Sequence, residues 1–139
     1  MNVVDSSGWL EYFADGPNAA HFAAPLVDIP ALIVPTITLF EVFKVVCRQR
    51  GEDAALQAVA LMQQGTVIEL TPALATLAAK TSLDLSLPMA DSIILCTARL
   101  HEATLWTQDE HFATIPGVRY FAKAQHSSAT LNSSPSGGG

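Results

Sequence analysis

The chain has 139 residues, of which half are apolar and 14% are charged, and this balance suits one compact domain with a substantial core. The formal net charge of −6 argues against binding nucleic acid through a broad basic surface, although an enzyme that meets phosphate through bound cations is compatible with it. No apolar stretch approaches the roughly 18 residues of a membrane span, and no basic segment precedes an apolar block at the N-terminus, so we expect a cytoplasmic protein with no membrane anchor.

Short apolar segments alternate along the chain with longer segments of helical periodicity. In chain order, the predicted elements are a strand at 1–4, helices at 8–13 and 17–27, a strand at 32–34, helices at 36–50 and 52–64, a strand at 66–70, helices at 73–83 and 88–102, a strand at 104–107, a short helix at 110–114 and a strand at 118–121. Brief strands separated by helices indicate βαβ units. We therefore expect a single α/β sandwich whose largely parallel sheet is covered by helices on both faces.

Several residues mark where the predicted helices begin and end. Thr36 and Thr71 are predicted to cap the helices that follow them, and Pro72 and Pro88 suit the first helical turn. Gly51 is predicted to end the helix that begins after Thr36. These signals support the helix boundaries independently of the apolar pattern.

The domain is predicted to span residues 1–126, and residues 127–139 are predicted to form a flexible tail. From Ser127 the chain is rich in serine and asparagine and ends in three glycines, a composition without fold content. Cys47 and Cys96 lie in apolar, helix-like segments without metal-ligand spacing, and we expect both to be buried reduced thiols.

Four acidic residues, Asp5, Glu41, Asp91 and Asp109, lie in apolar sequence. Asp5 ends the run Met-Asn-Val-Val, Asp91 precedes Ser-Ile-Ile-Leu, and Asp109 follows Leu-Trp-Thr-Gln. Glu41 lies inside Leu-Phe-Glu-Val-Phe. A carboxylate in apolar surroundings costs several kcal/mol unless it is paired, protonated or bound to a metal. A shared site for a divalent metal is therefore the first hypothesis.

The predicted elements can bring the four acids to one edge of the sheet. In parallel sheets, ligands gather beyond the carboxyl ends of the strands. Asp5 and Asp109 each follow a predicted strand, and Asp91 lies in the first turn of a helix at the same edge. Glu41 is on the helix face that is expected to point toward the core. We expect these side chains to converge.

Capping and local pairing offer an alternative explanation for each acid taken singly. Asp5 and Asp109 could each cap a following helix, and Asp91 could complement a helix N-terminus for roughly 0.3–1 kcal/mol. Glu41 could pair with Lys44 one turn later. Taken together the alternative weakens, because capping does not explain an acid in the middle of Leu-Phe-Glu-Val-Phe.

Electrostatic repulsion favours a bound cation if the acids do converge. Two like charges about 4 Å apart repel by roughly 4 kcal/mol at an effective dielectric constant near 20. Mg²⁺ or Mn²⁺ would offset that repulsion, because hard cations prefer carboxylate oxygens. The histidines lack the paired spacing of a zinc site, and we expect His111 to make local hydrogen bonds or packing contacts rather than to bind metal.

Four segments together resemble the PIN-domain ribonucleases, and most closely the VapC toxins of type II toxin–antitoxin systems. The resemblance covers roughly residues 1–123, and its motifs occur in the family's order. They are Val-Val-Asp5-Ser6-Ser7, the helical Glu41 after an apolar strand, Pro88-Met-Ala-Asp91-Ser-Ile-Ile, and Thr107-Gln-Asp109-Glu-His-Phe.

The resemblance implies a three-layer α/β/α sandwich around a mainly parallel, five-stranded sheet. It also implies a toxic endoribonuclease that hydrolyses RNA with a metal-activated water and leaves a 5′-phosphate and a 3′-hydroxyl. Asp5, Asp91 and Asp109 would bind Mg²⁺ or Mn²⁺, and Glu41 would do so directly or through a water. Ser6 and Thr107 match supporting hydroxyl positions, although the residue after the first Asp is more commonly threonine. The implied assembly is a homodimer that a small antitoxin protein inhibits.

Other functions fit the sequence less well. A haloacid-dehalogenase-type phosphatase would need an Asp where this chain has Ser7, and a receiver domain would need its acceptor Asp after the third strand, where Glu69 stands. A catalytically silent interaction module with this fold remains the main alternative, because a mean hydropathy of +0.32 suggests apolar surface for a partner. Lys44, Arg48 and Arg50 could guide RNA, but an ordinary solvated helix end is favoured.

Overall fold

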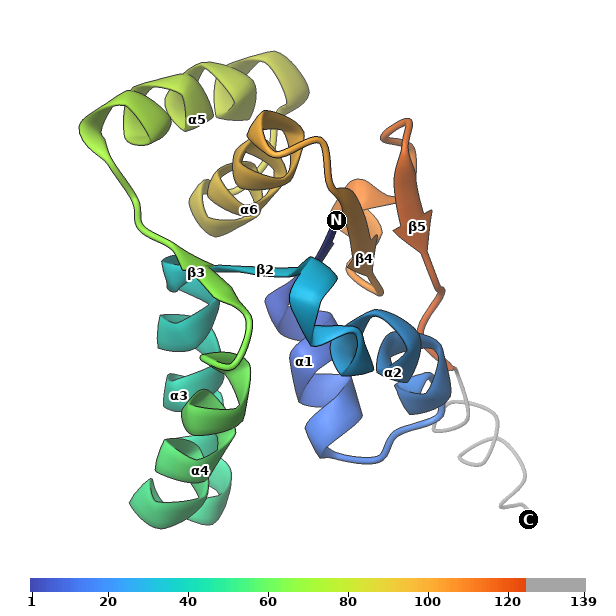
Figure 1. Cartoon of the computed structure of the whole chain (residues 1–139). Helices are drawn as coiled ribbons and strands as arrows, with labels where there is room; N and C mark the ends of the chain where they lie inside the picture. The colour runs from blue at the N-terminus through green and yellow to red at the C-terminus, as the bar shows by residue number, and fades with distance from the viewer. Residues whose placement is uncertain (125–139) are drawn as a thin grey trace, which may run out of the picture.

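The computed structural model describes residues 1–124 and contains one five-stranded sheet (Figure 1). The strands are β1 (Asn2–Val4), β2 (Leu32–Pro35), β3 (Thr66–Ile68), β4 (Thr104–Thr107) and β5 (Val118–Tyr120). Their order is β3-β2-β1-β4-β5, and every neighbouring pair is parallel. The mainly parallel five-stranded sheet is thus confirmed. The predicted tail, 127–139, and the last two residues of the predicted domain lie outside the described residues.

Six α-helices and two 3₁₀ turns connect the strands within residues 1–124. They are α1 (Ser6–Phe13), α2 (Ala19–Val27), η1 (Ile29–Ala31), α3 (Thr36–Arg50), α4 (Glu52–Met62), α5 (Pro72–Leu85), α6 (Met89–Leu100) and η2 (Glu110–Phe112). Thr71 caps α5 through its hydroxyl, and Gly51 follows α3 with a φ of 95°, as the sequence predicts. Thr36, however, is the first residue of α3 rather than its cap, which is Pro35.

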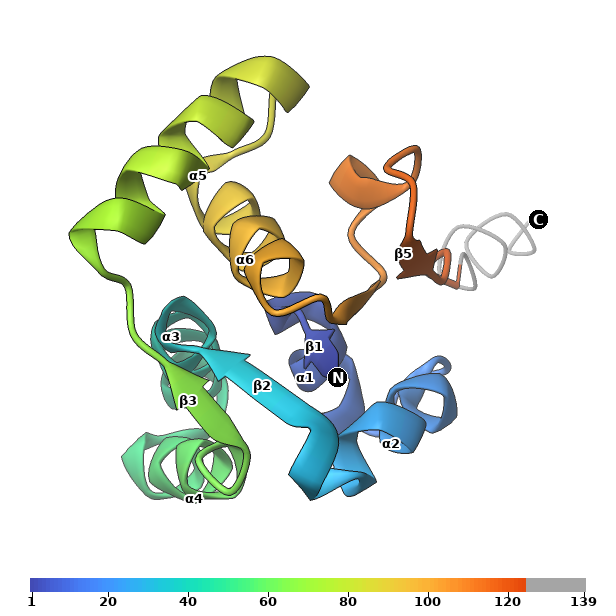
Figure 2. The same cartoon turned by 45° about the horizontal axis from the view of Figure 1, so that its top comes forward.

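The helices enclose the sheet on both faces, which confirms the three-layer sandwich (Figure 2). Successive residues of β1 point to opposite faces, because side chains alternate along a strand. Val3 packs in a core with Ile33 and with Ile94 of α6. Val4 packs in the other core, which α1 to α4 cover. The sheet therefore separates two apolar cores and is buried on both sides, as a parallel sheet requires.

A glycine allows α1 to begin close against the sheet. A Cβ atom at Gly8 would lie 2.5 Å from Cγ1 of Val4 and 2.8 Å from the ring of Phe22. The absence of a side chain at this position lets the first turn of α1 pack directly on β1 and α2. Because Asp5 stands between β1 and α1, this close approach fixes the position of its carboxylate.

Two helix pairs extend on either side of the sheet (Figure 1). Helices α3 and α4 lie side by side, and α5 and α6 do so at the opposite end of the molecule. Within residues 1–124, no helix combines the length and the apolar character that crossing a membrane requires.

Candidate active site

Three aspartates come together at the carboxyl edge of the central strands. Strands β1 and β4 pair in parallel with Val4 opposite Trp106, so both strands leave the sheet at the same edge. Asp5 follows β1 directly, and its backbone N–H donates to the Trp106 carbonyl at 3.1 Å. Asp109 comes two residues after β4, and Asp91 lies in the first turn of α6. The expected convergence is observed for these aspartates, whereas their assignment as metal ligands stays a prediction.

Asp5 is buried and held by three hydrogen bonds, with only 2% of its surface exposed. Its Oδ1 accepts from the Ser7 hydroxyl at 2.7 Å and from the Gly8 amide at 2.9 Å, while its Oδ2 accepts from the Thr107 hydroxyl at 2.6 Å. Burial raises the pKa of Asp5 to about 6, the hydrogen bonds oppose that rise, and the charge of Asp109 adds to it. Both oxygens therefore have fixed positions.

Asp91, Asp109 and His111 form the most compact cluster of ligand-type atoms at this edge. One ligand atom from each lies within 4.8 Å of the others. Nδ1 of His111 is 3.0 Å from Oδ2 of Asp91 and 3.0 Å from Oδ1 of Asp109. The Asp91 side chain is 13% exposed, whereas that of His111 is 54% exposed. The imidazole thus lies between the carboxylates on the solvent side.

The Asp91 carboxyl in this cluster is harder to ionise than a free one. Burial raises the pKa of Asp91 to about 7, with the charges of Asp109 and Asp5 adding to the rise and His111 opposing it. The pKa of His111 is raised in turn, first by the charge of Asp109. Oδ2 of Asp91 is buried and has no hydrogen bond of good geometry among residues 1–124, although His111 lies nearby. The His111 imidazole is therefore the group beside both carboxylates that favours their charged forms.

Glu41 reaches the same region from α3. It is half-buried, and its Oε1 accepts a hydrogen bond from the hydroxyl of Ser6, the first residue of α1. This bond joins α3 to the residue after Asp5. Lys44 lies over the Phe40 ring, 5.8 Å from its centroid, so the alternative that Glu41 pairs with Lys44 is not observed among the described residues.

Helix capping accounts for part of the arrangement. Asp5 caps α1 through the Gly8 amide, and Asp109 caps η2 through the His111 amide at 2.9 Å. Asp91 lies in the first turn of α6, as the alternative of complementing a helix N-terminus expects, but one of its oxygens is buried and has only the His111 imidazole beside it within residues 1–124. Glu41 accepts from the partly buried hydroxyl of Ser6. Capping and clustering therefore coexist, and capping alone does not explain Asp91 or Glu41.

Thr107 links two of the aspartates. Its hydroxyl donates to Oδ2 of Asp5 and accepts from the backbone N–H of Asp109 at 2.9 Å. Through these bonds the last residue of β4 sets the spacing of two acids that are far apart in sequence. This contact supports the predicted role of Thr107 as a supporting residue.

Sequence analysis missed Ser7 and Gln108. Ser7 donates to Asp5 and accepts from the Gln108 amide at 3.2 Å. The Gln108 side chain is buried, donates to Glu11 at 3.3 Å and accepts from Asn18 at 3.0 Å. The only local signal was a second hydroxyl near Asp5 and a glutamine beside Asp109. Their contacts join segments about a hundred residues apart, and a local sequence pattern cannot predict such contacts.

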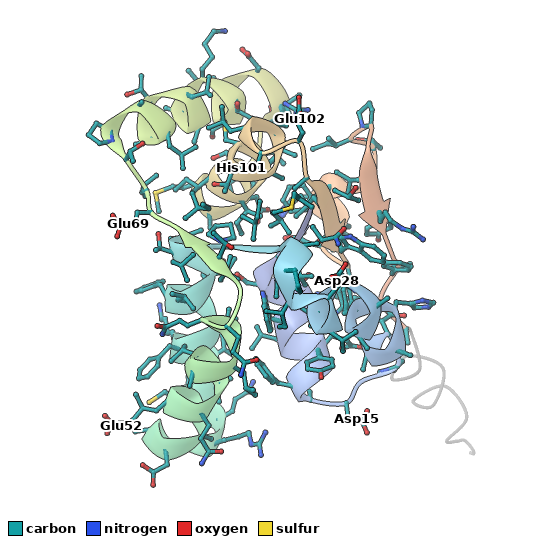
Figure 3. The ribbon with its side chains drawn as sticks, viewed as in Figure 1. Asp15, Asp28, Glu52, Glu69, His101 and Glu102 are labelled. Carbon is teal, nitrogen blue, oxygen red and sulfur yellow. The ribbon has the colours of Figure 1, made fainter. Side chains whose placement is uncertain are left out.

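Five other acids are spread over different elements, and Figure 3 labels them. The labelled Asp15, Asp28, Glu52, Glu69 and Glu102 are dispersed over the molecule rather than gathered. Asp15 and Glu102 occupy turns with positive φ, and Glu52 begins α4. The contrast supports the division between acids in apolar sequence and acids in turns.

The donor set fits a hard divalent cation. It consists of carboxylate oxygens with one imidazole beside them, and one buried oxygen of Asp91 has no hydrogen bond within the described chain. Mg²⁺ and Mn²⁺ prefer such oxygen ligands. A cation at this position would also offset the mutual repulsion that raises the pKa of Asp91.

We expect metal-free protein to lose stability as the pH rises from about 4 to about 7. The folded-state pKa values of Asp5 and Asp91 are about 6 and about 7, against an ordinary value of 3.8. Ionising these groups is thus harder in the folded chain, and Asp5 alone accounts for a loss of about 3 kcal/mol. The raised pKa of His111 also predicts a loss of stability with rising pH, because the stabilising charge of its protonated form is lost.

Urea denaturation in EDTA across this pH range measures the effect. Asp91→Asn should flatten the profile and raise stability near pH 8, because it removes one repelling charge. Asp84→Asn is the matched control, since Asp84 is exposed and pairs with Lys80 on α5. A profile for the unsubstituted protein that is flat, or that rises toward pH 8, would contradict the repulsion argument.

Comparison with known proteins places the chain in a family. Residues 3–118 match the PIN domain family. A toxin–antitoxin complex from Klebsiella pneumoniae is 26% identical, with 85% of this chain and 95% of that chain covered and a TM-score of 0.70. The sarcin–ricin-loop-cleaving toxin VapC20 of Mycobacterium tuberculosis is 17% identical, with 86% and 98% covered and a TM-score of 0.71.

A third similar structure is VapBC-1 from nontypeable Haemophilus influenzae, which is 18% identical, with 87% of this chain and 96% of that chain covered and a TM-score of 0.64. No curated protein sequence matches the chain significantly. The resemblance that the four motifs carry is confirmed by the family match, which spans most of the described residues. The chain therefore belongs to the PIN domain family.

Proposed function

We propose that the protein is a divalent-metal-dependent endoribonuclease and the toxic component of a type II toxin–antitoxin system. The observation that carries the proposal is the gathering of Asp5, Asp91 and Asp109 at the carboxyl edge of the sheet, around a buried Asp91 oxygen that among residues 1–124 has only the His111 imidazole beside it. Membership of the PIN domain family and similarity to toxin structures support the same conclusion.

In this proposal Asp91, Asp109 and Asp5 hold Mg²⁺ or Mn²⁺, and Glu41 binds it directly or through a water. A bound divalent cation neutralises phosphate oxygens and lowers the pKa of an attacking water. The acids would then act in hydrolysis of the RNA backbone, and the His111 imidazole, 3.0 Å from both carboxylates, would compete with the metal for Asp91 and Asp109.

The remaining residues of the site position the acids. Thr107 and Gly8 hold the two oxygens of Asp5, and the Ser6 hydroxyl holds Glu41. Partners of this kind keep ligands oriented before a cation arrives, which reduces the reorganisation that binding requires. We therefore assign Ser6 and Thr107 supporting roles.

RNA is the proposed substrate class. One similar structure is described as a toxin that cleaves the sarcin–ricin loop, which supports RNA as a substrate without identifying the target here. The alternative is a PIN-like interaction module without catalytic activity. The retention of all four acids and of both supporting hydroxyls favours the enzyme.

An antitoxin and a second copy of the chain are the proposed protein partners. Several similar structures are toxin–antitoxin complexes. A cavity of about 750 Å³ along α3 and α4 has mostly apolar walls that include Phe40 and Val59, with Lys44 and Arg48 beside them. These features suit an antitoxin segment that combines apolar and acidic side chains.

Purified protein is expected to cleave RNA in Mg²⁺ or Mn²⁺ and to stop in EDTA. Asp91→Asn should lower kcat by about 100-fold or more, because it removes charge from the centre of the site. Denaturing gels of an end-labelled structured RNA measure the cleavage, and Asp84→Asn should behave like the unsubstituted protein. Cleavage that persists after chelation would refute the metal-dependent reaction.

The hydroxyl of Ser6 is expected to contribute through Glu41. Ser6→Ala should reduce activity about tenfold and raise the Mg²⁺ concentration needed for half-maximal rate, because Glu41 loses the bond that orients it. Ser6→Thr should restore both values. Thr76→Ala, which removes an exposed hydroxyl bond in α5, controls for the loss of a hydroxyl. Equal metal dependence in Ser6→Ala and the unsubstituted protein would show that Glu41 needs no such support.

Expression of the protein alone is expected to arrest growth of a bacterial host. The arrest should disappear with Asp91→Asn and persist with Asp84→Asn, because only the former removes a proposed metal ligand. Growth curves at protein levels matched by immunoblot provide the comparison. Arrest by Asp91→Asn at matched levels would instead favour an interaction module that acts without catalysis.

A further inference from the structure

Two cavities meet beside the acidic site. The first, here named the α1–α3 cavity, has a volume of about 310 Å³. The second, the Asp109 cavity, has a volume of about 600 Å³ and includes Asp109 and His111 in its walls. Ser7, Gln108 and Lys123 belong to the walls of both. The two cavities together therefore form one trough that leads from α1 and α3 to the carboxylates.

Hydrogen bonds hold the residues that the two cavities share. Gln108 is buried, and its side chain donates to Glu11 and accepts from Asn18. Its backbone N–H donates to Ser7, whose hydroxyl donates to Asp5. The middle of the trough is thus joined to Asp5 by hydrogen bonds, so a strand lying in the trough would pass beside the acids.

Lysine and arginine side chains are scarce in this protein, and two of them line the trough. All seven lysines and arginines fall within residues 1–124. Lys80 pairs with Asp84 at 3.1 Å, and Arg119 lies 4.5 Å from the centre of the Trp106 ring. By contrast, Arg50 lines the α1–α3 cavity, and Lys123 lines both cavities.

The three basic residues of α3 therefore separate into two groups. Lys44 and Arg48 line the apolar cavity along α3 and α4, whereas Arg50, at the last position of α3, faces the trough. Glu11 is the acid in the α1–α3 cavity, and its carboxylate already accepts hydrogen bonds from Gln108 and from the Asn18 amide. The α1–α3 cavity thus has two cations, Arg50 and Lys123, against the single acid Glu11, whereas Asp109 and Glu110 line the other cavity.

We propose that the trough guides the RNA strand, with Arg50 and Lys123 contacting phosphates next to the one that is cleaved. The inference rests on the proposed nuclease function and assigns a substrate path to that site. The carboxylates repel a polyanion wherever a metal does not neutralise them, so neighbouring phosphates need cations of their own. Arg50 and Lys123 supply that charge and are positioning residues, not catalytic ones.

The test measures binding of a short, fluorescein-labelled single-stranded RNA in Mg²⁺ by fluorescence anisotropy, in the Asp91→Asn background, where the RNA should stay intact. Arg50→Gln and Lys123→Gln should each weaken binding about fivefold near 0.1 M salt and reduce the slope of log affinity against log salt by about 0.7, because each removes one phosphate contact. Lys123→Arg should retain the affinity. Lys80→Gln removes an equal charge away from the trough and should change little.

Cleavage kinetics in the protein without the Asp91 substitution provide the second measurement. Arg50→Gln and Lys123→Gln should raise KM and leave kcat near its original value, because they hold substrate and do not touch the reacting atoms. The inference is overturned if these variants match the unsubstituted protein, if Lys80→Gln weakens binding as much as they do, or if kcat falls while KM stays constant.

The outcomes also separate this inference from the proposed function. If the protein binds RNA through Arg50 and Lys123 but never cleaves it, the path stands and the hydrolytic function fails. If the protein cleaves RNA and the two variants behave like Lys80→Gln, the proposed nuclease function is supported and the RNA path along the trough is refuted. Protein that neither binds nor cleaves RNA would overturn both.

Discussion

The burial of the Asp5 carboxylate is the constraint on which the site depends. Its oxygens join the end of β1, the first turn of α1 and the end of β4, through Gly8 and Thr107. The parallel pairing of β1 and β4 makes these contacts possible, because both strands leave the sheet at the same edge. The same Thr107 hydroxyl then positions the amide of Asp109. Strand register therefore sets the geometry of the acids.

Burial of the aspartates and the repulsion between them oppose the stability of the metal-free fold. Hydrogen bonds to Asp5 favour its charged form, yet burial outweighs them and raises its pKa to about 6. Fewer interactions favour the charged form of Asp91. Among the groups that shift its pKa, the exposed His111 alone opposes the effect of Asp109 and Asp5. Helix capping by Asp5 and Asp109 gives each carboxylate a local structural role. Capping is thus a means of holding acids in place and does not compete with a metal site as an explanation.

Local patterns predicted the elements well and the contacts between them less well. The alternation of strands and helices correctly predicted the parallel sheet. The turn η1 was not predicted, and α2 begins at Ala19 rather than at Pro17, because turn residues make helix boundaries hard to predict from sequence. The apolar settings of the four acids pointed to the site. Ser7, Gln108 and Lys123 escaped notice because their neighbours are distant in sequence, and tertiary packing alone separates Arg50 from Arg48.

The carboxylate cluster has a consequence for the lifetime of the protein. A ligand that binds the native chain and not the unfolded one shifts the balance toward the native form in proportion to its concentration. A cation that replaced the His111 imidazole between Asp91 and Asp109 would act in this way, and unfolded chains are the ones that proteases degrade. Turnover of this protein in a cell would accordingly slow when divalent ions are plentiful and quicken when they are scarce.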